Sequence, residues 1–361
     1  MERFGFVGLP NAGKSSLFNA LAGGGALAAP YAFATTDPNV GVARVPDRRL
    51  EALATMSDSR EVVPATVQFV DIGGLVEGAS RGEGLGNRFL GGIREVDAIV
   101  YVLRAFTDPE VPGPVDPIDH LRVLELELTL ADLEAVEGRV DRRRKAARSE
   151  PRDTELAAEA AALDAALVAL EAGTPLYRSE LGDDQRASLR SHFLLTNKPV
   201  LAVVNVGEDQ LGDTEALTGA VREALPQSEA VLAVSVQLEA EAAQLPGAER
   251  AEMLEGLGLG EGALPRFVRA AYHGLGLRTF FTTGPKETRA WTFKAGWKAP
   301  RCAGVIHTDF ERGFIRAEVI ATDLLLEVGS WSAARERGVL RIEGKDYEVR
   351  DGDVLEVRFN V

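Results

Sequence analysis

The segment with the clearest chemistry lies near the N-terminus of this 361-residue chain: Gly8-Leu9-Pro10-Asn11-Ala12-Gly13-Lys14-Ser15. It has the spacing G-x-x-x-x-G-K-S, follows an apolar run at residues 3–9, and precedes apolar residues at helical spacing. Strand, glycine loop and helix in this order form a phosphate-binding loop. Its backbone N–H groups and the helix N-terminus surround phosphates, while Lys14 neutralises charge and Ser15 ligates Mg²⁺. The pattern predicts a nucleoside triphosphate site with Mg²⁺ as cofactor.

A second motif follows an apolar run at residues 68–71. Asp71-Ile72-Gly73-Gly74 fits D-x-x-G, in which Asp71 holds Mg²⁺ through water and the N–H of Gly74 contacts the γ-phosphate. The next residue is Leu75, where Ras-like enzymes carry a glutamine that orients the attacking water. Because leucine cannot orient water, turnover is expected to be slow, well below ~10 s⁻¹.

A loop between these two motifs contains Thr35 and Thr36. A nucleotide-sensing loop needs one threonine hydroxyl on Mg²⁺ and the γ-phosphate. Spacing alone does not choose between the two residues, and it does not exclude an ordinary loop.

The motif that reads the base is altered. Guanine-specific relatives use N-K-x-D after a strand, where the aspartate accepts hydrogen bonds from guanine. One partial match to this motif is Asn197-Lys198-Pro199-Val200, which precedes its strand and lacks the aspartate. We therefore do not expect it to read the base. Asn205-Val206-Gly207-Glu208 follows the strand, with valine in place of lysine and glutamate in place of aspartate. Guanine selectivity should therefore be lost. A preference for ATP does not follow from the spacing.

Short apolar runs that could position these motifs alternate with helical stretches. Such alternation predicts an α/β fold of the P-loop nucleotide hydrolase type, with a parallel sheet covered by helices on both sides. The runs lie at residues 3–9, 68–71, 98–103, 199–205 and 230–235.

A different pattern interrupts this alternation. Residues 118–195 lack strand-like runs, and Leu156, Ala160, Leu163, Leu167 and Leu170 repeat at steps typical of paired helices. With a facing helix at about 119–147 and a bend around Pro151, the pattern predicts an inserted antiparallel helical hairpin.

The last part of the chain predicts a small β-rich domain. Strands are expected at 303–307, 313–320, 339–342 and 354–359, with turns at residues 344–347 and 350–353. The predicted domains are a nucleotide-binding domain at 1–117 and 196–277, a helical insert at 118–195, and a C-terminal domain at 278–361.

Composition limits the classes of protein to which the chain can belong and the cell compartment in which it works. A net charge of −15 argues against a protein that coats nucleic acid with its whole surface. No apolar run approaches the roughly 20 residues that a membrane span needs, and the N-terminus does not resemble a signal peptide. Cys302 is the only cysteine, which excludes an intrachain disulfide and fits a reducing cytoplasm.

With these residues placed, the chain resembles the YchF family of Obg-related ATPases over nearly its full length. The resemblance is carried by residues 8–16, 33–41, 71–94, 205–208 and 279–361, and the last of these looks like the family's TGS domain. It implies a cytoplasmic, ribosome-associated enzyme that prefers ATP to GTP, with the large subunit and ribosomal RNA as expected partners and no membrane.

The resemblance also implies roles for individual residues. Thr35, not Thr36, becomes the switch threonine on Mg²⁺, and Asn205 and Val206 lie at the adenine. Asn11 in the phosphate loop is a candidate to help admit K⁺. The remaining nucleotide contacts are expected from the rest of the loop, namely Ala12, Gly13, Lys14, Ser15 and Ser16.

One departure from the family concerns the loop after the strand at 97–103. The family usually carries a histidine there, a candidate for catalytic assistance, whereas residues 104–114 contain none. His120 lies beyond that loop and is interpreted as a helix-start residue without a catalytic role.

Two other functions stay open from the residues. One is a GTP-specific Obg-type factor, which Glu208 in place of aspartate argues against. The other is a nucleotide-gated binding module whose slow hydrolysis only resets it, an alternative that Leu75 favours. Metabolic kinases of the P-loop class are disfavoured, and the sequence leaves the oligomeric state open.

A basic cluster at one end of the predicted hairpin is the strongest candidate for an RNA contact, because an acidic protein must concentrate its positive charge to touch phosphate. A solvated helix end, with cations suited to the helix dipole, is an equal alternative. The cluster comprises Arg139, Arg142, Arg143, Arg144, Lys145 and Arg148.

Overall fold

The computed structural model describes residues 1–23, 39–72 and 85–360, and it separates into two compact units. Unit 1 comprises Met1–Ala43 and Gln68–Phe267, and unit 2 comprises Arg44–Val67 and Val268–Val361. Within the described ranges, no helix is long and apolar enough to cross a membrane.

Five strands in the sheet of unit 1 come from the predicted apolar runs, whereas the edge strand β2 was not predicted. Its order is β2-β4-β1-β5-β6-β7, and β1 pairs in parallel with both β4 and β5, as β6 does with β5 and β7. The strands are β1 (Arg3–Val7), β2 (Val40–Arg44), β4 (Thr66–Asp71), β5 (Ala98–Arg104), β6 (Val200–Asn205) and β7 (Val231–Val234). β5 and β6 are buried along their whole length, which explains their continuous apolar sequences.

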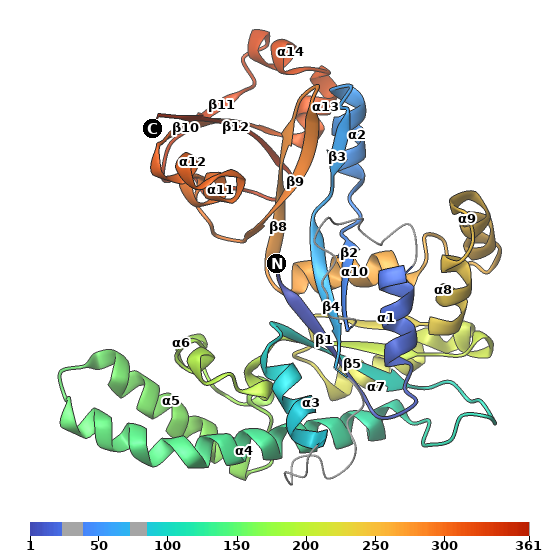
Figure 1. The fold of residues 1–361 in the computed structure, drawn as a ribbon, viewed down its shortest axis with the longest axis vertical. Coiled ribbons are helices and arrows are strands. Elements are labelled where there is room, and N and C mark those ends of the chain that lie inside the picture. Colours follow the sequence, from blue (N-terminus) through green and yellow to red (C-terminus); the bar gives the residue numbers. More distant parts are fainter. Residues whose placement is uncertain (24–38, 73–84, 361) are drawn as a thin grey trace. The chain divides into compact units, whose positions relative to one another are not determined.

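Helices cover this sheet, and Figure 1 shows their arrangement. The helices of unit 1 are α1 (Lys14–Gly23), α3 (Leu85–Arg94), α4 (Pro117–Ser149), α5 (Thr154–Glu171), α6 (Asp183–Ser188), α7 (Thr214–Ala224), α8 (Val236–Ala243), α9 (Gly247–Gly256) and the start of α10 (Ala263–Gly274). Short 3₁₀ turns lie at Leu176–Arg178, Arg190–His192, Leu195–Asn197 and Glu208–Asp213.

The two faces of the sheet bury different side chains. On one face, aliphatic residues of β5, α3, α4 and α7 form one cluster that includes Ile93, Leu124 and Val221. Elsewhere the rings of Phe6 and Phe267 pack against Phe69, with centroids 5.4 Å apart in each pair. The predicted α/β fold with helices on both sides is confirmed.

The predicted hairpin is formed by α4 and α5. Asp116 caps α4 by accepting hydrogen bonds from the N–H groups of Ile118 and Asp119, and Pro117 occupies its first turn. Asp153 caps α5 through the N–H of Leu156. Between the helices lies an apolar seam that includes Val136, Val140, Leu163, Ala166 and Leu170.

Unit 2 contains a second sheet, in the order β11-β10-β12-β8-β9-β3. Its strands are β3 (Glu61–Val63), β8 (Leu277–Thr283), β9 (Glu287–Lys294), β10 (Phe314–Ala321), β11 (Arg341–Glu343) and β12 (Asp353–Phe359). Its helices are α2 (Arg48–Met56), α11 (Ala299–Ile306), α12 (Thr308–Arg312), α13 (Thr322–Val328) and α14 (Trp331–Glu336). The C-terminal part is thus β-rich, as expected.

One expected strand of this unit is wrong. Residues 303–307 were predicted as a strand, but Ala303 to Ile306 belong to the helix α11. Pro300 lies in the first turn of α11, where proline favours helix entry, and a short apolar run cannot by itself distinguish a strand from a buried helix. The strand expected at 339–342 is the shorter β11, while β8 and β9 were not predicted.

The three predicted domains stay a prediction. The contacts group Arg44–Val67 with the C-terminal residues, whereas the sequence interpretation included them in the nucleotide-binding domain. This segment is tied to unit 2 because β3 pairs in parallel with β9 and Arg49 forms an ion pair of 2.8 Å with Asp351. Neither pairing leaves a local signal in the sequence.

Candidate nucleotide-binding site

The predicted phosphate loop joins β1 to α1. The N–H of Ala12 donates to the carbonyl of Leu9, at 3.3 Å, and Leu17 donates to Gly13, at 2.9 Å. Gly13 has a φ of 96°, a conformation that favours glycine, and a side chain there would collide with Asn205. Gly8 is similarly constrained, because a Cβ atom would come within 2.6 Å of the carbonyl of Val102.

Lys14 begins α1 and is almost fully buried, with 6% of its surface exposed. Its Nζ donates a hydrogen bond of 2.8 Å to the carbonyl of Leu9, so the ammonium lies under the loop. Burial lowers the pKa of Lys14, and the charge of Asp71 acts in the opposite direction. Ser15 and Ser16, which follow in the first turn of α1, are exposed.

Asp71 ends β4, beside the start of the phosphate loop. In the parallel register Asp71 lies opposite Phe6, so both strands end at the same edge of the sheet. This edge is where ligands bind in open α/β sheets. The Oδ1 atom of Asp71 is buried and has no hydrogen-bond partner among the residues that the structure describes, which makes it a candidate acceptor for a hydrated cation.

These residues fit the Mg²⁺ that the phosphate-loop fold implies. Ser15 and Asp71 supply the hydroxyl and the carboxylate, and Mg²⁺ prefers such hard oxygen ligands together with water and phosphate. Within the described ranges, no group of three or more His, Cys, Asp or Glu side chains could hold a metal by itself. A nucleotide would therefore have to complete the coordination.

Two predicted site residues, Thr35 and Gly74, lie outside the described residues, as do Thr36 and Leu75. Their proposed roles stay predictions.

Asn205 ends β6 and connects three parts of the site. Its Nδ2 donates to the carbonyl of Ala12 at 3.0 Å, and its Oδ1 accepts a hydrogen bond of 3.2 Å from the N–H of Val236. The side chain is buried, with 5% exposed. Asn205 thus ties the phosphate loop to the start of α8, a contact that was not predicted from the sequence.

The rest of the base-reading segment divides between core and surface. Val206 is 2% exposed and belongs to the aliphatic cluster that includes Ile93, Leu124 and Val221. Glu208 is exposed at the start of the 3₁₀ turn Glu208–Asp213. Its carboxylate is therefore accessible to a ligand, whereas the side chain of Val206 packs into the protein.

The structure also brings Arg104 and His120 to this edge of the unit. Both side chains are 1% exposed, and both hold carbonyl groups of residues 105–116, the connection between β5 and α4. The signal for Arg104 in the sequence is slight: a cation at the end of a strand that is otherwise apolar. His120 lies in the first turn of α4, as predicted.

Two family models match this chain. A family model described as "50S ribosome-binding GTPase" matches residues 3–136. A second model, YchF-GTPase_C, described as "Protein of unknown function (DUF933)", matches residues 277–360.

Full-length relatives are also similar. The chain is 47% identical to the ribosome-binding ATPase YchF of Bacillus subtilis over 363 residues, which cover 99% of each protein. It is 44% identical to the protein of that name from Escherichia coli O157:H7 over 360 residues, again 99% of each. The solved YchF GTPase of Schizosaccharomyces pombe matches with a TM-score of 0.87 and 33% identity, covering 99% of this chain and 97% of that one. On sequence, length and fold together, the chain belongs to the YchF family.

Proposed function

We propose that the protein is a Mg²⁺-dependent ATPase that prefers ATP to GTP and acts as a ribosome-associated nucleotide switch in the cytoplasm. The observation that carries the proposal is that Lys14, the Oδ1 of Asp71 and the bridging Asn205 lie at one edge of the sheet, with this Oδ1 buried and without a partner in the described part of the chain. Similar proteins are named ribosome-binding ATPases, so the ribosome is the proposed partner and ATP is the proposed nucleotide.

The chain's own residues would bind and orient the nucleotide. The N–H groups of residues 11–16 and the N-terminus of α1 face phosphate, and the ammonium of Lys14 offsets negative charge on the β- and γ-phosphates. Ser15, Asp71 and the hydroxyl of Thr35 would hold Mg²⁺, which neutralises charge that develops during phosphoryl transfer. The N–H of Gly74 would contact the γ-phosphate, and K⁺ beside Asn11 is a further candidate cofactor.

Base choice would depend on the segment at 205–208. A guanine site needs an aspartate carboxylate facing N1 and the 2-amino group, and Glu208 places its carboxylate one methylene farther from the backbone. The GTP-specific alternative is less favoured for this reason. The alternative of a binding module with slow hydrolysis shares the same site and differs only in turnover.

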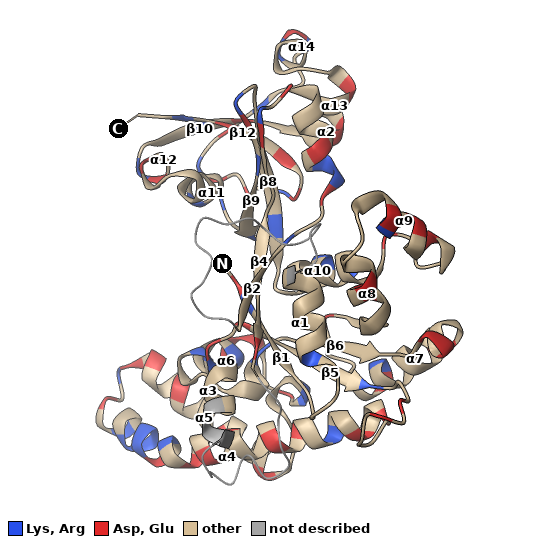
Figure 2. Ribbon diagram, turned by 45° about the vertical axis from the view of Figure 1, so that its right-hand side comes forward, with Lys and Arg blue, Asp and Glu red and all other residues tan. Residues whose placement is uncertain are grey.

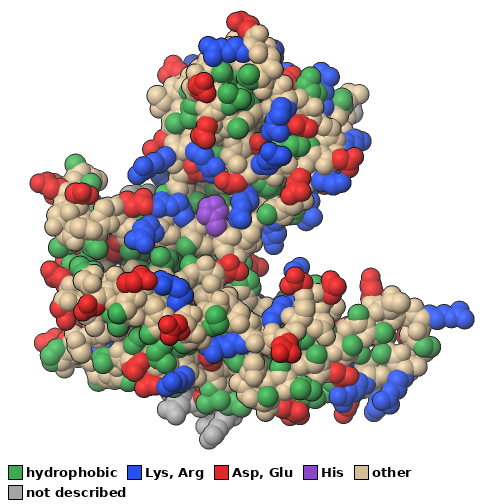
Figure 3. Space-filling model, turned by 180° about the vertical axis from the view of Figure 1, so that it is seen from behind, with side chains coloured by type: hydrophobic (Ala, Val, Ile, Leu, Met, Phe, Trp, Pro, Cys, Tyr) green, Lys and Arg blue, Asp and Glu red, His purple; other side chains and the backbone are tan. Residues whose placement is uncertain are grey.

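The end of the helical hairpin is the proposed contact with ribosomal RNA. Figure 2 shows blue residues clustered on α4 near the turn that leads to α5, and Figure 3 shows basic side chains gathered at that end on the molecular surface.

The structure divides the six cations of this cluster into two groups. Arg139 donates to the carbonyl of His192 at 2.8 Å, Arg143 pairs with Glu159 at 3.1 Å, and Arg144 pairs with Asp164 at 2.8 Å. Arg142, Lys145 and Arg148 are exposed and make no ion pair with any residue that the structure describes. These last three residues are the available phosphate ligands.

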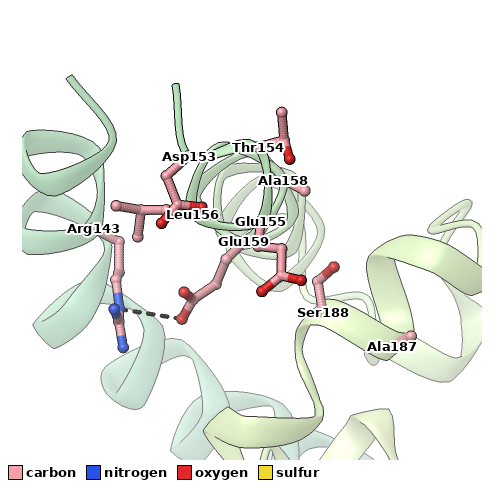
Figure 4. A pocket seen from close by; sticks show the side chains of 9 residues that line it. All are labelled: Arg143, Asp153, Thr154, Glu155, Leu156, Ala158, Glu159, Ala187 and Ser188. Atoms are coloured by element: carbon pink, nitrogen blue, oxygen red, sulfur yellow. Dashed lines mark hydrogen bonds and ion pairs between the residues drawn. The ribbon is translucent and has the colours of Figure 1, made fainter. Parts of the chain in front are cut away.

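The orientation of Arg143 supports this division. Figure 4 shows Arg143 pointing toward Glu159. Both residues line an open groove of about 650 Å³, which is formed by residues of α4, α5 and α6. The groove is also lined by Asp153 and Glu155, so its potential repels phosphate. An RNA backbone should therefore contact the outer surface of α4 and avoid this groove.

The proposed activity is tested by measuring phosphate release from ATP and GTP in Mg²⁺ buffer, with and without ribosomes. Lys14→Ala should abolish tight binding of Mg·ATP while the chain remains folded. Affinity equal to that of the unaltered chain in this variant would contradict the site.

A further inference from the structure

Arg104, the last residue of β5, is buried to a degree that is rare for arginine. Only 1% of it is exposed, and a buried cation needs partners to offset its lost hydration. Its three donor nitrogens bond to the carbonyls of Phe106, Val111 and Pro112, at 3.1, 2.9 and 3.1 Å. The guanidinium lies 4.5 Å from the centroid of the Phe106 ring, and no carboxylate in the described ranges pairs with it.

All three acceptors belong to residues 105–116, which we call the connecting segment. Other bonds hold this segment at both ends. The N–H groups of Ala105 and Phe106 donate to the carbonyl of Asn205, at 2.9 and 3.0 Å. At the far end, the Nε2 of His120 lies 3.0 Å from the carbonyl of Pro114. Arg104 holds the middle of the segment, where the described backbone bond, from the N–H of Val111 to the carbonyl of Asp108 at 3.1 Å, stays within the segment itself.

The connecting segment in turn contacts the phosphate loop. The Nδ2 of Asn11 donates a hydrogen bond of 3.2 Å to the carbonyl of Pro112, the same oxygen that accepts from Arg104. Asn11 has a φ of 63°, which is uncommon outside glycine. An external bond to its side chain helps to hold that conformation. The position of Arg104 therefore determines where the acceptor for Asn11 lies.

Two positive charges, those of Arg104 and Lys14, act on the buried His120. Burial lowers the pKa of His120, and the positive charges of both Arg104 and Lys14 lower it further, against the effects of the Pro114 carbonyl and Asp116. Because a carbonyl oxygen can only accept a hydrogen bond, the Nε2 of His120 carries the hydrogen that it shares with Pro114.

We propose that Arg104 is a positioning residue of the nucleotide site, which holds the connecting segment against the phosphate loop and so fixes Asn11 in its binding conformation. The role rests on the proposed function, because it assumes that this loop binds a nucleotide. Arg104 acts through Pro112 and Asn11 and does not itself touch the ligand. Without the three hydrogen bonds of Arg104, the connecting segment should no longer be held in place, and the nucleotide should dissociate faster.

The test uses two different changes in the full chain. Arg104→Lys keeps the charge but cannot reach three carbonyls at once. Gly113→Ala leaves Arg104 intact and instead strains the turn, because Gly113 has a φ of 116°. A Cβ atom at Gly113 would lie 3.8 Å from the Nη1 of Arg104, so the change acts through the backbone and not through a collision.

The measured quantity is the dissociation rate of a fluorescent ATP analogue with Mg²⁺, followed by stopped flow at a temperature where all variants are folded. Both variants should release the analogue about tenfold faster, the factor expected from the loss of roughly one hydrogen bond to a charged group. Arg250→Lys is the matched control. Arg250 is also buried, at 8% exposed, but its ion pair is with Glu239 and not with the connecting segment.

The outcomes separate the two proposals. If the unaltered chain fails to bind the analogue, the proposed function is wrong. If it binds, and Arg104→Lys and Gly113→Ala lower thermal stability but release the analogue at the unaltered rate, Arg104 only stabilises the fold and the positioning role is overturned. Faster release in both variants and not in Arg250→Lys supports the role, and a failure of Arg104→Lys to fold leaves Gly113→Ala to decide it.

Discussion

The exposed cations at the end of the hairpin give a prediction whose size follows from the structure. Arg142, Lys145 and Arg148 are to be replaced together by glutamine, which removes three charges and preserves helix propensity. Arg143 and Arg144 are left in place, since their ion pairs with Glu159 and Asp164 join α4 to α5. The hairpin should therefore fold normally in the variant.

Counterion release sets the expected magnitude. Each cation that neutralises a phosphate contributes about 0.7–0.9 to the slope of log affinity against log salt concentration. Three contacts therefore account for a slope of about 2 to 3. Their removal should flatten the salt dependence by that amount and weaken ribosome binding at physiological salt.

The assay is co-sedimentation with purified ribosomes at a series of KCl concentrations, with ATP binding measured in parallel. A control variant carries glutamine at Arg60, Arg222 and Arg266, three exposed arginines outside the hairpin, so both variants have the same net charge. If the two variants lose affinity equally, only net charge matters. If the hairpin variant binds as tightly as the unaltered chain and with the same slope, the hairpin is not the RNA contact, and the C-terminal domain becomes the next candidate.

Further predictions concern the site and the core. Glu208→Asp should raise affinity for GTP relative to ATP, measured by calorimetry, and an unchanged ratio would show that Glu208 does not read the base. The sequence also suggests Val206→Lys as part of a rebuilt guanine motif, but Val206 is 2% exposed, so that change should mainly lower the melting temperature. Asn205→Ala should destabilise the chain by about 1–3 kcal/mol in urea unfolding, because it leaves the Ala12 carbonyl and the Val236 N–H without partners; a loss below about 0.5 kcal/mol would contradict the bridge. Burial raises the pKa of the Cys302 thiol to about 12, so the thiolate should be scarce at pH 8 and native protein should react with a thiol reagent far more slowly than unfolded protein; equal rates would refute the burial.

Much of the fold of unit 1 could be predicted because its signals are local. β5 and β6 are continuous apolar runs since both of their faces are buried, and Pro151 with the leucine spacing of α5 predicts the hairpin. The strand–loop–helix order around Lys14 likewise places the phosphate loop. Each of these features depends on residues adjacent in the chain.

The features that were missed depend on distant residues. β3 pairs with β9 across more than two hundred residues, and no short pattern in either strand identifies the other. The helix α11 was predicted as a strand because four apolar residues have no clear period. Arg104 binds backbone carbonyls, which every residue possesses, so its partners cannot be found from residue types.

The base-reading segment contains both a feature that the sequence predicts and one that it does not. Its position after β6 follows from the sequence, and Asn205 lies where the motif requires. The opposite environments of Val206 and Glu208, one in the core and one exposed, depend on how β6 and the following turn pack. Only the structure shows that the side chain of Glu208 is exposed and that of Val206 is buried.

The central claim, a Mg²⁺-dependent site on the phosphate loop that prefers ATP, is tested most directly by isothermal titration of the unaltered chain and Lys14→Ala with Mg·ATP and Mg·GTP. The account predicts that the unaltered chain binds Mg·ATP more tightly than Mg·GTP and that Lys14→Ala binds neither tightly. Tighter binding of Mg·GTP by the unaltered chain, or undiminished Mg·ATP binding by Lys14→Ala, would contradict it.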